Sequence, residues 1–170
     1  MRLSRHLLAA FAPVLIAAAP AVHGVEAPKV QVEYVHPENF ADVGDGFRGG
    51  DAARSAYLEA LNRHLQARAA RVLGNGQSLK VSITEVDMAG EFEPWRIAGA
   101  DVRIVRNIYP ARIDLSFRLA DAGGAVVKEG ERRLRDTGFT DDVTRYSDDP
   151  LRYEKALIDA WVEREFPAPR

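Results

Sequence analysis

The fold is decided by the stretch Arg112-Ile113-Asp114-Leu115-Ser116-Phe117-Arg118-Leu119, in which polar and apolar residues alternate without a break. Successive side chains of a β-strand point to opposite faces, so this alternation predicts a strand with one buried and one solvated face. The next residues, Asp121-Ala122-Gly123-Gly124, have the composition of a tight turn. Residues 111–134 are therefore predicted to form an antiparallel hairpin.

Three segments upstream are also predicted to be strands. Residues 30–34 and 79–84 alternate between apolar and polar side chains in the same way. Residues 102–108 are a further candidate, in which Val102, Ile104 and Ile108 are expected to face inward. The chain thus supplies four to five strands.

Two helices are predicted around these strands. The first follows Asp51, a suitable N-cap, and ends at Gly74-Asn75-Gly76. The second has Asp149 as its N-cap and Pro150 at its first position, and Pro167 stops it. Apolar residues recur on one face of each helix at intervals of three and four. These residues are Ala53, Tyr57, Ala60, Leu61, Leu65, Ala69 and Val72 in the first helix, and Tyr153, Leu157, Ala160 and Trp161 in the second.

The resulting order is β-α-β-β-β-β-α. Consecutive strands between two helices indicate an α+β fold rather than alternating parallel units. We expect a mostly antiparallel sheet of four to five strands with both helices packed on one face.

The first 24 residues are predicted to be a secretory signal peptide. Arg2 and Arg5 precede an apolar stretch over residues 7–19, and small residues follow it. The apolar stretch is short and contains a proline, which argues against an uncleaved membrane anchor. Cleavage is expected before Val25, with cleavage after Ala21 as the alternative.

This leader predicts a periplasmic or secreted protein with no membrane span after cleavage. Residues 25–166 are expected to form a single domain, and residues 167–170 a C-terminal tail. Cleavage would remove two of the four histidines and leave His36 and His64.

The composition excludes several function classes. The chain has 170 residues and no cysteine, which rules out disulfides, cysteine zinc sites and thiol nucleophiles. Its 23 Lys and Arg residues are balanced by 25 Asp and Glu residues, whereas a nucleic-acid-binding domain normally carries an excess of basic residues. We expect no nucleic-acid partner.

Two motifs with possible chemistry are weak. Residues 44–49 match the glycine-rich G-x-G-x-x-G pattern of dinucleotide-binding turns. The preceding strand, however, ends near Val35, well before the glycines, and the carboxylates of Asp45 and Asp51 would repel a phosphate. A loop is therefore expected. His36 and His64 are too few and too far apart for a two-histidine zinc site. His64 borders the apolar stripe of the first helix and is expected to be a packed side chain.

Residues 84–95 are the most unusual stretch, with four acidic residues, a glycine and a tryptophan. Asp87 and Glu91, with Asp136 as a third group, could bind a divalent cation or act as an acid/base pair. Alternatively, the acids are solvated or paired with arginines at positions 103, 106 and 112, and we expect this second arrangement. A second acidic cluster leaves calcium binding open, and its members are Asp136, Asp141, Asp142, Asp148 and Asp149.

The chain resembles the domain of unknown function 3016, a family of exported, uncharacterised bacterial proteins. The resemblance rests on segments 36–43 and 76–81, on Asp87-Met88-Ala89-Gly90-Glu91, on residues 103–113 with Tyr109-Pro110, and on segments 130–131 and 134–136. Ala111 departs from it, because a second proline is expected there. The resemblance implies a single exported domain and brings no catalytic residues.

The sequence therefore favours a non-enzymatic envelope module that binds a partner or an envelope component, with no cofactor and no resident metal. Phe92, Trp95 and Arg96 are the predicted contact residues, because aromatic and arginine side chains dominate binding surfaces. The competing hypothesis is a small hydrolase or divalent-metal-dependent enzyme that uses Asp87, Glu91 and Asp136. An accessory or inhibitor domain is a third possibility that the sequence does not separate from the first.

Overall fold

A computed structural model describes residues 29–43, 50–93, 103–138 and 148–167. Two helices and six strands are present in these ranges, together with one 3-10 turn. The elements in chain order are β1 (Val30–Tyr34), η1 (Pro37–Asn39), α1 (Gly50–Ala70), β2 (Ser78–Asp87), β3 (Glu91–Phe92), β4 (Arg103–Ile104), β5 (Arg112–Ala120), β6 (Val126–Arg135) and α2 (Arg152–Glu165).

The main sheet has four strands in the order β1-β2-β5-β6. β5 pairs antiparallel with β2 on one side and with β6 on the other, which confirms the predicted hairpin. β1 instead runs parallel to β2, with Val30 opposite Leu79. The expected α+β fold is thus confirmed, but the sheet is mixed and not mostly antiparallel. Alternation of side chains is the same in both kinds of pairing, so it does not reveal strand direction.

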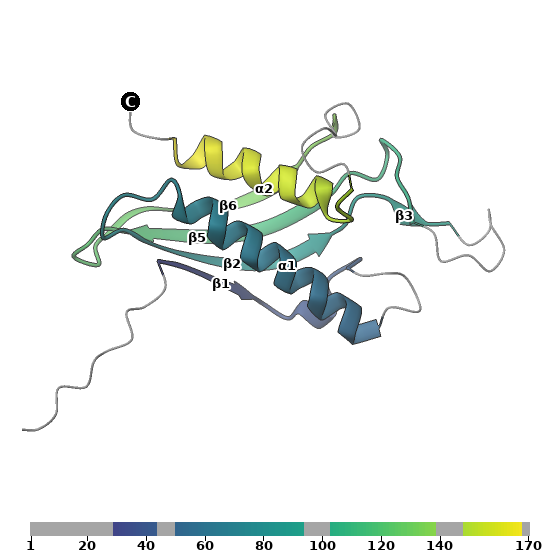
Figure 1. Cartoon of the computed structure of the whole chain (residues 1–170), viewed down its shortest axis with the longest axis horizontal. Coiled ribbons are helices and arrows are strands. Elements are labelled where there is room, and N and C mark those ends of the chain that lie inside the picture. The colour runs from purple at the N-terminus through teal and green to yellow at the C-terminus, as the bar shows by residue number, and fades with distance from the viewer. Residues whose placement is uncertain (1–28, 44–49, 94–102, 139–147, 168–170) are drawn as a thin grey trace, which may run out of the picture.

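The predicted strand at residues 102–108 is largely wrong. Val102 lies outside the described residues, and within residues 103–108 only Arg103–Ile104 forms a strand, which pairs with β3 in a separate two-stranded sheet. Ile108, expected to face inward, is 69% exposed. Figure 1 shows β3 lying beyond the end of the four-stranded sheet.

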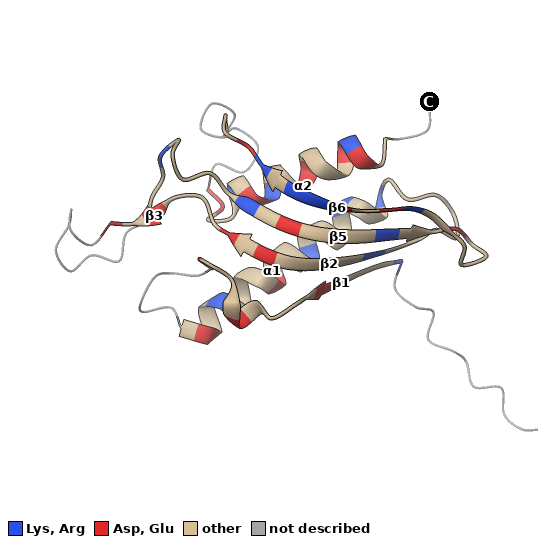
Figure 2. Ribbon diagram, turned by 180° about the vertical axis from the view of Figure 1, so that it is seen from behind, with Lys and Arg blue, Asp and Glu red and all other residues tan. Residues whose placement is uncertain are grey.

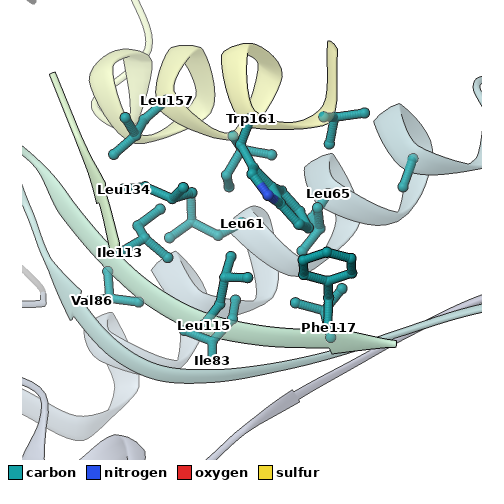
Figure 3. Close-up of a cluster of buried hydrophobic side chains, with 14 of the residues drawn as sticks. Leu61, Leu65, Ile83, Val86, Ile113, Leu115, Phe117, Leu134, Leu157 and Trp161 are labelled. Carbon is teal, nitrogen blue, oxygen red and sulfur yellow. The ribbon is translucent and has the colours of Figure 1, made fainter. Parts of the chain in front are cut away.

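Both helices cover the same face of the main sheet (Figures 1 and 2), as expected. Leu61 and Leu65 from α1 and Trp161 from α2 point toward β5, where Phe117 lies beneath them (Figure 3). The Trp161 ring packs edge-on against Phe117 at 5.8 Å and against Phe166 at 5.7 Å between ring centroids. This aromatic contact joins α2 to the sheet.

The helix starts differ slightly from prediction. α1 begins at Gly50, so Asp51 lies in the first turn. α2 begins at Arg152, and Asp149 lies three residues earlier, where its Oδ1 accepts the Leu151 N–H at 2.8 Å. Ala160, predicted to be on the buried face of α2, is exposed.

His64 is a packed side chain, as expected. Its Nε2 lies 2.9 Å from Oδ1 of the buried Asp159, and this contact joins α1 to α2. Within the described ranges, no helix has the length and apolar character needed to cross a membrane. The predicted signal peptide and the glycine-rich segment at residues 44–49 lie outside the described residues.

Candidate functional site

The chain makes a tight bend between β2 and β3, and two hollows lie beside it. Gly90 adopts φ +88°, and a Cβ there would lie 2.9 Å from the carbonyl oxygen of Ile104. The Gly90 N–H donates to the Tyr109 carbonyl at 2.9 Å. Glycine is therefore required by both the backbone conformation and the close approach of β4. Met88 lines both hollows.

The first hollow, here called the aromatic hollow, has a volume of about 270 Å³. Its walls come from α1, the end of β2, the β3–β4 sheet and the start of α2. Phe92, one of the three predicted contact residues, lines this hollow. The full lining is Tyr57, Met88, Ala89, Phe92, Arg103, Val105, Pro150, Arg152 and Tyr153.

Two guanidinium groups lie against aromatic rings in this hollow. Arg103 lies over the Phe92 ring at 4.5 Å and donates two hydrogen bonds to the Asp42 carboxylate, at 2.7 and 2.9 Å. Arg152 lies over the Tyr153 ring at 4.5 Å. Among the described residues no carboxylate lies within ion-pairing distance of Arg152, so its charge is available to an anionic group.

Glu154 supports the floor of the aromatic hollow. Its side chain is 1% exposed, and its Oε1 accepts the backbone N–H of Ala89 at 2.7 Å. Burial raises the pKa of this carboxyl, because the charged form loses its hydration. Within the described part of the chain the other oxygen, Oε2, has no hydrogen-bond partner.

The second hollow, here called the acidic hollow, has a volume of about 200 Å³ and contains both Asp87 and Glu91. Burial raises the pKa of Asp87, the nearby Arg112 opposes this shift, and Asp42, Glu85 and Glu91 add to it. The rest of the lining is Met88, Gly90, Ile108, Tyr109, Pro110, Arg112 and Arg135. The hollow thus combines acidic and basic groups.

The other two acids of residues 84–95 are paired with arginines, as the second interpretation expects. Glu85 Oε2 lies 3.7 Å from Arg112 Nη2, and Glu85 Oε1 accepts the Ala41 N–H at 2.8 Å. The buried Glu93 accepts from Arg106 Nη2 at 2.9 Å. Arg103 pairs elsewhere, with Asp42.

The structure separates the remaining predicted site residues. Asp136 is exposed and does not line the acidic hollow, and its Oδ1 accepts the Gly138 N–H at 2.9 Å. Trp95 and Arg96 lie outside the described residues, as do Asp141 and Asp142. Across the residues that the structure describes, no group of three or more His, Asp or Glu side chains is arranged to hold a metal ion.

Sequence reasoning missed four residues of the aromatic hollow. Tyr57 and Tyr153 are predicted to belong to the core because they fall on the apolar helix faces, and both do pack against it while also lining the hollow. Arg103 is predicted only as a partner for acids. Arg152 carried no signal. Tyr57 lies in the first half of α1 and Tyr153 near the start of α2. An aromatic residue near a helix start, beyond the centre of the core, was the available clue.

A wider hollow of about 480 Å³ lies on the open face over β2, β5 and β6. Three of its four charged side chains form ion pairs. Lys80 Nζ lies 3.1 Å from Glu33 Oε2, and Arg118 Nε lies 3.1 Å from Glu129 Oε2. Most of the charges on this surface are therefore already paired.

Comparison with known protein families assigns the chain to one of them. The family described as "Protein of unknown function (DUF3016)" matches residues 28–164. The chain belongs to this family. In this DUF3016 member, the Asp87–Glu91 segment that carried the resemblance lies between the two hollows.

Two solved structures are similar to this DUF3016 member at a distance. The PelC dodecamer from Paraburkholderia phytofirmans has 16% identity and a TM-score of 0.34, with 84% of this chain and 88% of that chain covered. A minor lipoprotein from Acinetobacter baumannii has 10% identity and a TM-score of 0.29, with 82% and 87% covered. No curated protein matches the chain.

Proposed function

We propose that this protein is an exported, non-enzymatic binding protein of the cell envelope, and that its ligand or partner contacts the aromatic hollow. The observation that carries the proposal is the set of aromatic rings and guanidinium groups gathered there. Phe92, Tyr57 and Tyr153 supply apolar and aromatic surface, while Arg152 supplies a positive charge that no carboxylate of the described residues pairs with. Side chains of these types contribute most of the binding energy at protein interfaces.

The hollow is also preorganised. Arg103 is held by Asp42 and lies over the Phe92 ring, so both side chains have little freedom to lose when a ligand binds. Glu154 fixes the backbone at Ala89, which lines the hollow. Groups held in place before binding lower the entropic cost of association.

Export is the second part of the proposal, and the composition of residues 1–24 supports it. Residues 25–166 would form the exported domain, with residues 167–170 as a tail. The partner is then an envelope protein or another envelope component, and we propose that Trp95 and Arg96 contact it together with Phe92.

Affinity purification from envelope extract tests this assignment. We expect Phe92→Ala, Trp95→Ala and Arg96→Ala each to reduce recovery of the partners captured by the parent protein. Val35→Ala is the matched control, because Val35 is 36% exposed, lines neither hollow and lies outside β6. If the three variants recover the same partners as the parent and the control, the contact surface is assigned wrongly.

A second candidate function is a hydrolase or divalent-metal-dependent enzyme at the acidic hollow. The observation that favours it is the shared location of Asp87 and Glu91, with the raised pKa of Asp87. Asp136 is expected to take no part. A rise in melting temperature with calcium or magnesium that Asp87→Asn removes and Asp136→Asn retains would support this function. No rise with either ion would contradict its metal-dependent form.

A further inference from the structure

One long edge of the main sheet has no strand beside it in the described part of the chain. β6 is the last strand in the order β1-β2-β5-β6, and it extends over ten residues, Val126–Arg135. Figure 2 shows the sheet from the face that the helices leave open, with β6 along one margin. Val126 and Val127, at its start, are 45% and 53% exposed. An unpaired edge of this length is a template for a further strand.

The charges along β6 fall into two blocks. Glu129, Glu131, Arg133 and Arg135 are all exposed and point to the open face, since they lie opposite the polar residues of β5. The first two positions are acidic and the last two are basic. A strand with this order is electrostatically complementary to itself when it is reversed.

We propose that two copies of this chain associate through their β6 edges, antiparallel, with the two Arg132 residues facing each other at the two-fold axis. This register places Glu129 opposite Arg135 and Glu131 opposite Arg133, each pair formed twice by symmetry. Opposite charges at directly facing positions stabilise strand pairing. The result is a continuous sheet across both copies.

The neighbouring registers are less favourable. In an antiparallel pair of strands, two residues that face each other have their side chains on the same face of the sheet. The nearest alternative registers therefore move the two-fold axis by one residue along β6, to Glu131 or to Arg133. An axis at Glu131 sets two glutamates against each other, and an axis at Arg133 sets two arginines against each other. The axis at Arg132 avoids a like-charge pair on the open face.

The helix-facing side of β6 tolerates the same register. Arg132 would face its own copy, but its guanidinium is already bound to Glu165, through Nε and Nη2 at 2.8 Å each. Lys128 shares the Glu165 carboxylate with Arg132, at 2.8 Å, and would face the exposed Asp136 of the second copy, an attractive pair. Glu165 thus reduces the repulsion between the two Arg132 residues at the axis.

Sedimentation of the purified protein over a concentration series tests the proposal. We expect a monomer–dimer equilibrium that shifts toward the monomer as salt is added, because the pairs are exposed. Glu129→Arg with Glu131→Arg makes all four positions basic, and should weaken dimerisation at least about tenfold. Arg133→Glu with Arg135→Glu should do the same with four acidic positions.

Two further measurements separate this register from other modes of association. The two double variants, mixed in equal amounts, should form a heterodimer. The fourfold variant that exchanges both blocks should dimerise like the parent, and circular dichroism verifies that each variant is folded. A parent protein that stays monomeric, a dimer unaffected by the double variants, or a mixture that does not associate would overturn the proposal.

Discussion

Oε1 of Glu154 accepts a hydrogen bond from the backbone N–H of Ala89, with 2.7 Å between the two atoms. This bond ties the first turn of α2 to the bend that follows β2, next to Met88, which lines both hollows. Glu154 is 1% exposed, so a charged carboxylate there would have almost no contact with water. This burial raises the pKa of Glu154, whereas the hydrogen bond from Ala89 opposes the shift, so the stability of this contact depends on pH.

Glu154→Gln should alter how the stability of the protein depends on pH. Burial raises the folded-state pKa of Glu154 above its usual value of 4.5. The stability that the protonated carboxyl contributes is complete below pH 4.5 and is lost as the pH rises through the folded-state pKa. Glutamine keeps the acceptor for Ala89 and does not ionise. The free energy of unfolding of the parent should therefore fall relative to that of Glu154→Gln as the pH rises from 4.5 toward neutrality.

Denaturant titrations at several pH values measure this difference. Curves for the two proteins that stay parallel across the range would contradict a buried, protonated Glu154.

Glu165 should show the opposite dependence. Arg132 and Lys128 bind its carboxylate at 2.8 Å and lower its pKa from 4.5 to about 2. This stabilisation is present above pH 4.5 and is lost as the pH falls toward 2. Both cations are partly exposed, so Glu165→Gln should cost about 1–2 kcal/mol at neutral pH, and the difference should vanish near pH 2.

Glu59→Gln is the control for this measurement. Glu59 forms an exposed pair with Arg63 on α1, and its loss should change stability by no more than about 0.5 kcal/mol. A Glu165→Gln variant as stable as Glu59→Gln at neutral pH would show that the Glu165 contacts contribute little.

Gly90→Ala tests the bend directly. Gly90 and Gly124 both have positive φ, at +88° and +83°, but a Cβ at Gly90 would meet the Ile104 backbone whereas one at Gly124 would meet nothing within 4 Å. Gly124→Ala should therefore cost only the backbone strain, about 1 kcal/mol, and Gly90→Ala clearly more. Thermal unfolding of both variants measures the difference, and equal losses would mean that β4 does not press on the bend.

Local patterns predicted the main sheet well where one face is buried. Leu79, Val81 and Ile83 alternate with polar residues, and all three are buried as expected. Alternation carries no information about which strand lies alongside, so the parallel pairing of β1 with β2 was not predictable from it. Helix α1 connects these two strands, and a crossover of this kind permits parallel pairing.

The site was predicted only in part, for a related reason. The position of Asp87 and Glu91 on either side of a tight bend brought them to one hollow, as their closeness in sequence suggested. Asp136, distant in sequence, is held in its own turn. The aromatic hollow combines α1, β3 and α2, and periodicity describes one element at a time. Tyr57 and Tyr153 therefore looked like core residues.

Site-specific photo-crosslinking in the intact envelope is the most direct test of the proposed binding surface. A benzophenone-bearing phenylalanine analogue replaces Phe92 in one variant and Val35 in another, with both proteins produced at the same level. Val35 is 36% exposed, lines neither hollow and lies outside β6. We predict a discrete crosslinked product from position 92 that Arg152→Ala weakens, and none of that size from position 35. The same product from both positions, or a product from position 35 alone, would contradict a binding site at the aromatic hollow.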